Sequence, residues 1–70
     1  MNIFCQRLKE VRKENNLTQK QLASLLHTTD DSIFSWEKGR SQPSIELLQK
    51  ICTELNVSSD YLIVLKDDMD

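Results

Sequence analysis

Gly39 and Pro43 are the one glycine and the one proline of this 70-residue chain. An all-β domain needs many tight turns, and Gly and Pro are among the residues that most often make them. So small a supply of turn residues favours an all-α fold with short loops. A chain of this length forms one domain and buries about 60% of the surface that its unfolded form exposes. Little room remains for a deep active-site cavity.

Apolar residues recur at helical spacing along the chain. In the first such segment, Phe4, Leu8 and Val11 share one face, because residues four and seven positions apart align on a helix. The predicted helices cover residues 3–15, 18–26, 30–38, 44–55 and 58–65. The pattern predicts a compact all-α five-helix bundle formed by residues 1–65, followed by an acidic tail at residues 66–70.

Small polar residues mark the ends of these helices. Thr18 and Gln21 have the spacing of a capping box, in which each side chain binds the backbone N–H of the other residue. The pair Asn15-Asn16 and the single Gly39 stand where a left-handed cap is expected after the first and third helices. The other N-cap candidates are Thr29, Ser44 and Ser58. These signals leave three or four residues between the second and third helices, the arrangement of a helix-turn-helix.

Charge is distributed unevenly, although the net value is only −2. Residues 1–45 hold seven Lys or Arg against five Asp or Glu, a balance of +2. Residues 46–70 hold two against six, a balance of −4. Such asymmetry indicates where a partner surface lies. A surface for a polyanion is therefore expected in the first two-thirds of the chain.

Several classes of protein are disfavoured. No apolar run reaches the roughly 20 residues of a membrane span, and the N-terminus lacks the layout of a signal peptide, so we expect a cytoplasmic protein with no membrane partner. Cys5, Cys52 and His27 lack the close ligand pairs of a metal site, and the cysteines are expected to be small buried hydrophobes. With one histidine, no nucleophile motif and no Gly-rich phosphate loop, we expect neither an enzyme nor a cofactor or small-molecule ligand.

The third predicted helix has two distinct sides. On a wheel at about 100° per residue, Ile33 and Trp36 fall on the side that must anchor the helix to the core, and Glu37 lies at the boundary. The outer face carries Asp30, Asp31, Phe34, Ser35 and Lys38. This face is therefore available to a partner.

Two stretches, LTQKQLASLLHTTDDSIFSWEKG and QPSIELLQKICTELNVSSDYL, resemble the phage repressor/Cro-type helix-turn-helix family, the lambda-repressor-like or XRE-type regulators. The resemblance runs from about Phe4 to Leu62. It implies a compact five-helix domain that regulates transcription on the nucleoid, usually as a repressor. It also implies a homodimer that binds double-stranded DNA at a palindromic operator, with the second helix of the motif in the major groove.

The resemblance also assigns roles to particular positions. In this family, the residue at Gln19 commonly binds phosphate and braces the recognition helix, and the residue at Glu37 commonly pairs with that at Arg12. The positions that would contact bases are Thr29, Asp30, Asp31 and Ser35. Independently, helix N-termini present free N–H groups that suit phosphate, and nearby cations add charge. The phosphate-contact candidates are Thr18, Gln19, Lys20, Lys38, Arg40 and Ser44. The alternative interpretation of each is an ordinary helix cap or a solvated surface side chain.

Three features depart from the family pattern. His27 stands where the turn usually has Gly, and a left-handed histidine costs on the order of 1 kcal/mol. Phe34 stands where a small or polar residue is usual; it could touch a thymine methyl, pack on a partner protein or fold back on its own surface. Asp30 and Asp31 fall in the first turn of the predicted helix, where the positive end of the helix dipole stabilises negative charge. They could also accept a hydrogen bond from cytosine N4, or mark a helix that no longer meets DNA.

The last predicted helix carries more apolar surface than one face can bury. Tyr61, Val64 and Leu65 are therefore candidates for a dimer interface, with core packing as the alternative. A protein-interaction module, such as an antitoxin-like or scaffold domain, is the alternative function. Salt separates the two functions, because DNA binding weakens steeply as salt rises.

Overall fold

The computed structural model describes residues 3–63 of the chain. Its elements are α1 (Ile3–Glu14), α2 (Gln19–Leu26), α3 (Asp30–Glu37), α4 (Ile45–Leu55) and α5 (Ser59–Ile63). No strand occurs in this range, so the predicted all-α class with five helices is confirmed. The predicted continuation of the last helix to Leu65 and the acidic tail at residues 66–70 lie outside the described residues.

The predicted N-caps are confirmed. The Thr18 hydroxyl accepts from the Gln21 N–H at 3.0 Å, and the Gln21 side chain accepts from the Thr18 N–H at 2.8 Å, which completes the capping box. The hydroxyls of Thr29, Ser44 and Ser58 accept backbone N–H groups three residues ahead at 3.1–3.2 Å. Each cap satisfies one of the donors that a helix start leaves unpaired. Local sequence therefore fixes where these helices begin.

Left-handed residues end the helices. Asn16, His27 and Gly39 have φ values of 59°, 58° and 77°, and Asn56 after α4 has φ 54°. The αL conformation turns the chain away from the helix axis and lets the next N–H groups reach the last carbonyls. The first and third helices each end one residue earlier than predicted, at Glu14 and Glu37, which is the usual uncertainty of a helix boundary.

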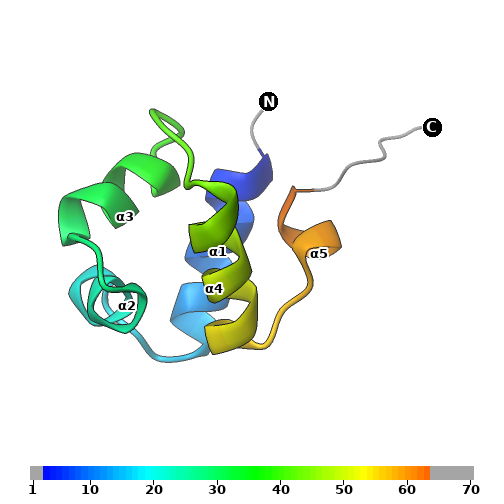
Figure 1. The fold of residues 1–70 in the computed structure, drawn as a ribbon, viewed down its shortest axis with the longest axis horizontal. Coiled ribbons are helices and arrows are strands. Elements are labelled where there is room, and N and C mark those ends of the chain that lie inside the picture. Colours follow the sequence, from blue (N-terminus) through cyan, green and yellow to red (C-terminus); the bar gives the residue numbers. More distant parts are fainter. Residues whose placement is uncertain (1–2, 64–70) are drawn as a thin grey trace.

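The core draws side chains from all five helices. Its residues are Phe4, Leu8, Val11, Leu22, Ala23, Leu26, Ile33, Trp36, Ile51, Leu55 and Leu62. Figure 1 shows α1 and α4 in the middle of the molecule, with α2 and α3 on one side and α5 on the other. α1 packs against both α3 and α5. The helix-turn-helix is thus held from behind while the other side of α3 is uncovered. None of the helices between residues 3 and 63 has the length and apolarity to cross a membrane.

Candidate nucleic-acid interface

A tight left-handed turn sets the direction of α3 relative to α2. The His27 N–H donates to the Ser24 carbonyl at 3.2 Å, and the Thr28 N–H donates to the Ala23 carbonyl at 2.9 Å. These two bonds have the pattern of a Schellman motif, which requires the αL conformation at His27. Thr29 then caps α3. Glycine is the usual residue at such a position because it has no Cβ, so His27 carries strain there, and the two backbone hydrogen bonds hold it in this conformation.

The structure places the residues of α3 as the wheel predicts. Ile33 and Trp36 are 0% and 4% exposed, so they anchor the helix to the core. The predicted outer face consists of Asp30, Asp31, Phe34 and Lys38, which are exposed, and Ser35, which is partly exposed. Thr29, at the start of this face, is also exposed, and its hydroxyl lies 3.1 Å from that of Ser32. The candidate base-contacting residues therefore share one accessible side.

A nearly buried polar network fixes both ends of the helix-turn-helix to α1. Arg12 Nε and Nη2 donate to the two carboxylate oxygens of Glu37 at 2.6 and 3.1 Å. The side chains of Arg12 and Glu37 are only 9% and 4% exposed. Arg12 Nη1 donates to the Leu17 carbonyl at 2.8 Å. The guanidinium therefore bridges the start of α2 to the end of α3, and the bidentate geometry makes the bridge directional.

Gln19 belongs to the same network. Its Nε2 donates to Glu37 Oε1 at 3.1 Å, so the side chain braces α3 as the resemblance implies. The phosphate contact expected for Gln19 would therefore use the second hydrogen of its amide or the backbone N–H in the first turn of α2. The Leu17 carbonyl was not predicted to take part, because no sequence signal distinguishes a backbone acceptor of this kind.

The other phosphate candidates lie at helix starts or beside α3. Thr18 and Lys20 flank the N-terminus of α2, and Ser44 caps α4; all three are exposed. Lys38 and Arg40 lie at the end of α3, where Lys38 Nζ and Arg40 Cζ are 5.5 and 5.8 Å from the centre of the Phe34 ring. The structure thus brings both cations to the ring. Within residues 3–63, no three His, Cys, Asp or Glu side chains lie close enough to hold a metal ion.

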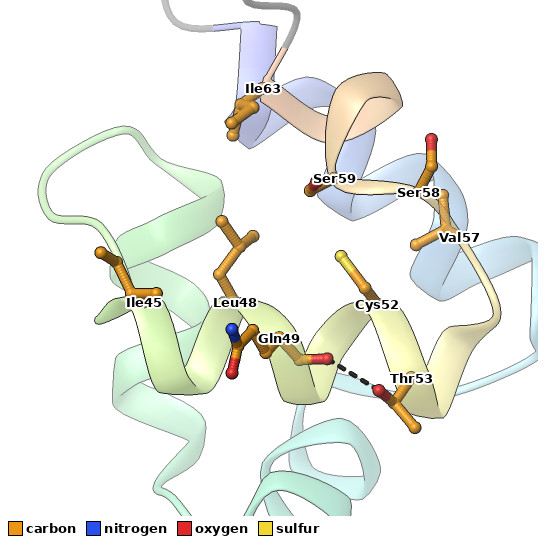
Figure 2. A pocket seen from close by; sticks show the side chains of 9 residues that line it. All are labelled: Ile45, Leu48, Gln49, Cys52, Thr53, Val57, Ser58, Ser59 and Ile63. Carbon is orange, nitrogen blue, oxygen red and sulfur yellow. Dashed lines mark hydrogen bonds between the residues drawn. The ribbon is translucent and has the colours of Figure 1, made fainter.

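A second exposed surface lies between α4 and α5. It is an open groove of about 690 Å³. Figure 2 shows Leu48 and Cys52 of α4 pointing toward α5, Leu48 in the direction of Ile63 and Cys52 in the direction of Ser59. Ile45 lines the groove as well and is 76% exposed. Desolvation by burial raises the pKa of the Cys52 thiol above its ordinary value of 9.0. Apolar side chains and Cys52 therefore make up somewhat more than half of the residues that line the groove, and the others are Gln49, Thr53, Ser58 and Ser59.

Tyr61 is attached to α1 although the residue is 40% exposed. Arg7 Nη1 donates to the Tyr61 carbonyl at 2.8 Å, and Arg7 Cζ lies 4.3 Å from the ring centre. The Tyr61 hydroxyl donates to Glu10 Oε1 at 3.4 Å. The roles of Arg7 and Glu10 were missed, since α1 and α5 are far apart in sequence. The other two dimer-interface candidates, Val64 and Leu65, lie outside the described residues.

Comparison with known proteins identifies the arrangement. A family model described as helix-turn-helix matches residues 8–62. The chain is 34% identical over 68 residues to YobD of Bacillus subtilis, an uncharacterised HTH-type transcriptional regulator, covering 97% of this chain and 61% of YobD. It is 37% identical over 60 residues to the HTH-type transcriptional activator BcrR of Enterococcus faecalis, covering 86% of this chain and 29% of BcrR. The chain therefore spans less than two-thirds of either relative.

A solved structure agrees with the sequence relatives. The P22 c2 repressor, crystallised with a synthetic operator, superposes with a TM-score of 0.84 at 25% identity. The match covers 90% of this chain and 96% of the repressor chain. The lambda-repressor-like fold is therefore confirmed over nearly the whole length.

Proposed function

The chain belongs to the helix-turn-helix family of DNA-binding transcription regulators, and we propose that it reads a specific double-stranded DNA sequence as a homodimer, with α3 in the major groove. We propose no enzymatic activity for this domain, in keeping with the transcription regulators that it resembles. We place its action in the cytoplasm, on the nucleoid. One observation carries the proposal: the polar side of α3 is uncovered, while its other side is fixed by Ile33, Trp36 and the ion pair of Glu37 with Arg12.

A rigidly held helix with one exposed polar face suits the major groove, which is about 12 Å wide and admits an α-helix. The first turns of such a helix meet base edges. In α3 these turns carry the proposed base-contacting residues, which are Thr29, Asp30, Asp31, Phe34 and Ser35. The bracing network matters because base readout requires side chains held on a fixed backbone.

Asp30 and Asp31 have two compatible roles. Both lie in the first turn of α3, where each stabilises the helix by about 0.3–1 kcal/mol through the dipole. In the groove, a carboxylate accepts a hydrogen bond from cytosine N4. Repulsion from nearby phosphates lowers non-specific affinity at the same time. The two aspartates therefore favour binding to a specific sequence at the expense of non-specific affinity for DNA.

The phosphate contacts are proposed around the edge of the same face. The N-termini of α2 and α4 offer unpaired N–H groups and the positive ends of helix dipoles. Lys38 and Arg40 provide charge beside Phe34. The proposed set is Thr18, Gln19, Lys20, Lys38, Arg40 and Ser44. Contacts of this kind position the protein without reading sequence.

A homodimer on a palindromic operator follows from the small size of one recognition helix. The second base-reading surface would come from a second copy related by two-fold symmetry. The apolar groove between α4 and α5, with Ile45 exposed at its edge, is the proposed contact region, together with Tyr61, Val64 and Leu65. We propose repression as the outcome, because a dimer that occupies a promoter excludes other proteins from it.

Selection of bound fragments from a random double-stranded DNA pool tests the proposal directly. We expect a two-fold symmetric motif at low salt, with affinity falling steeply between about 50 and 200 mM salt through counterion release. Selection with Asp31→Gln should change the preferred base at one position in each half-site. If no motif is enriched at low salt, the protein does not read DNA sequence. The acidic face of α3 would then be better explained as the surface of a protein-interaction module.

A further inference from the structure

Phe34 is the one large apolar residue on the outer face of α3, where the other residues are polar or charged. It lies on the same face of α3 as Asp30, one helical turn further on, and the residue is 40% exposed. Docking α3 against DNA would remove this ring from water. A phenyl ring gains from that desolvation only if it meets another apolar group. The base edge in front of it must therefore offer one.

The two cations beside the ring narrow the choice of partner. Lys38 Nζ and Arg40 Cζ lie 5.5 and 5.8 Å from the ring centre, within the range of a cation–π contact. They make the surroundings of the ring positively charged. An apolar patch on a partner protein is poorly matched by two flanking cations, whereas a nucleic acid places phosphates on either side of each base edge.

The major groove has one apolar group on its base edges, the C5-methyl of thymine. We propose that Phe34 determines specificity by packing against a thymine methyl, while Lys38 and Arg40 hold the adjacent phosphates. The inference rests on the proposed function and names one of the bases that are read. Because Asp30 and Phe34 are a turn apart on one face, the thymine belongs to the same half-site as any cytosine that the acids contact.

Replacement of thymine by deoxyuridine removes the methyl and leaves base pairing unchanged. Starting from the selected operator, each thymine of the half-site is replaced in turn in both half-sites, and the affinity of the full chain is measured. We expect one position at which the wild-type protein loses about fourfold in affinity per half-site, the factor associated with burying one methylene-sized group. Phe34→Ala should bind the thymine and deoxyuridine operators equally.

Matched variants separate this effect from damage to the fold. Leu25 on α2 is also 40% exposed, so Leu25→Ala removes similar apolar surface and should keep the full deoxyuridine effect. Lys38→Gln and Arg40→Gln should each reduce the salt dependence by about 0.9 in log–log slope for every phosphate that the variant no longer binds, again with the deoxyuridine effect intact. Thermal unfolding by circular dichroism should show Phe34→Ala folded as the wild type.

Two results would overturn the inference while leaving the proposed function in place. One is an enriched motif in which no thymine methyl affects affinity. The other is a methyl effect that persists in Phe34→Ala. Failure to enrich any motif would instead reject the proposed function. Crosslinking of Phe34→p-benzoylphenylalanine to a partner protein, with no crosslink to operator DNA, would assign the ring to a protein surface and would also reject the inference.

Discussion

Arg12 and Glu37 show how single residues can control the geometry of the proposed DNA-binding face. Their side chains are nearly buried, and the carboxylate also accepts from Gln19. A buried pair of this kind adds little net stability compared with apolar residues, but removal of one member leaves an uncompensated charge. Its structural value here is directional, because it joins α1 to α3.

Arg12→Ala should therefore be strongly destabilising. We expect a loss of about 3–5 kcal/mol in the free energy of unfolding, a large part of the roughly 4–10 kcal/mol expected for a domain of this size. Urea titration followed by circular dichroism measures the change. Lys13→Ala, at an exposed neighbouring position, is the control and should cost less than about 0.5 kcal/mol. Equal losses for the two variants would show that the pair is not important for stability.

Cys52 should react slowly as a nucleophile. Burial raises the pKa of its thiol above 9.0, and the thiolate is the reactive form. In Cys5→Ser protein, alkylation by iodoacetamide should therefore have a pH midpoint above that of the urea-unfolded chain. By linkage, a raised folded pKa leaves stability unchanged below about pH 9 and lowers it as pH rises through the folded pKa. Identical pH profiles in the native and unfolded states would contradict this.

At the scale of elements, the caps and the left-handed residues determine where each helix begins and ends. The capping box and the hydroxyl caps depend on neighbours within three or four residues, which is why sequence predicted them. The turn between α2 and α3 is different. It contains a left-handed His27, a strained choice that the backbone bonds of the Schellman motif maintain.

His27→Gly should relieve this strain. We expect the free energy of unfolding to rise by about 1 kcal/mol, because glycine adopts the αL conformation without a side-chain clash. Asn56→Gly makes the same change at a second left-handed position and should have a smaller effect, since Asn tolerates αL better. Chemical denaturation compares the two variants. A destabilised His27→Gly would mean that the imidazole makes a contact worth more than the strain.

At the scale of the whole molecule, two surfaces lie on different sides of the core. The acidic and basic residues of α3 face one side, and the apolar groove lies between α4 and α5. Figure 1 shows α5 on the side of the molecule away from α2 and α3. A second copy can therefore bind at the groove without covering the exposed face of α3.

Ile45→Glu should weaken dimerisation without unfolding the monomer. Ile45 is 76% exposed, so the charge costs little in the monomer, but at an interface it would be desolvated. We expect the dimer dissociation constant to rise at least about tenfold, which corresponds to about 1.4 kcal/mol. Sedimentation equilibrium over a range of concentrations measures it. Gln42→Glu adds the same charge on an exposed loop residue and should leave the constant unchanged. An unaltered constant for Ile45→Glu would exclude this surface.

Sequence by itself determined the helical class, the caps and the two faces of α3, because each depends on residues that are near neighbours along the chain. The resemblance then supplied the pairing of Arg12 with Glu37. Only the tertiary structure decided the contacts between distant elements. These are the attachment of Tyr61 to Arg7 and Glu10, the use of the Leu17 carbonyl, the groove at Ile45, and the two cations over Phe34. They depend on how helices cross, and helix crossing is set by the packing of the whole core rather than by any local pattern.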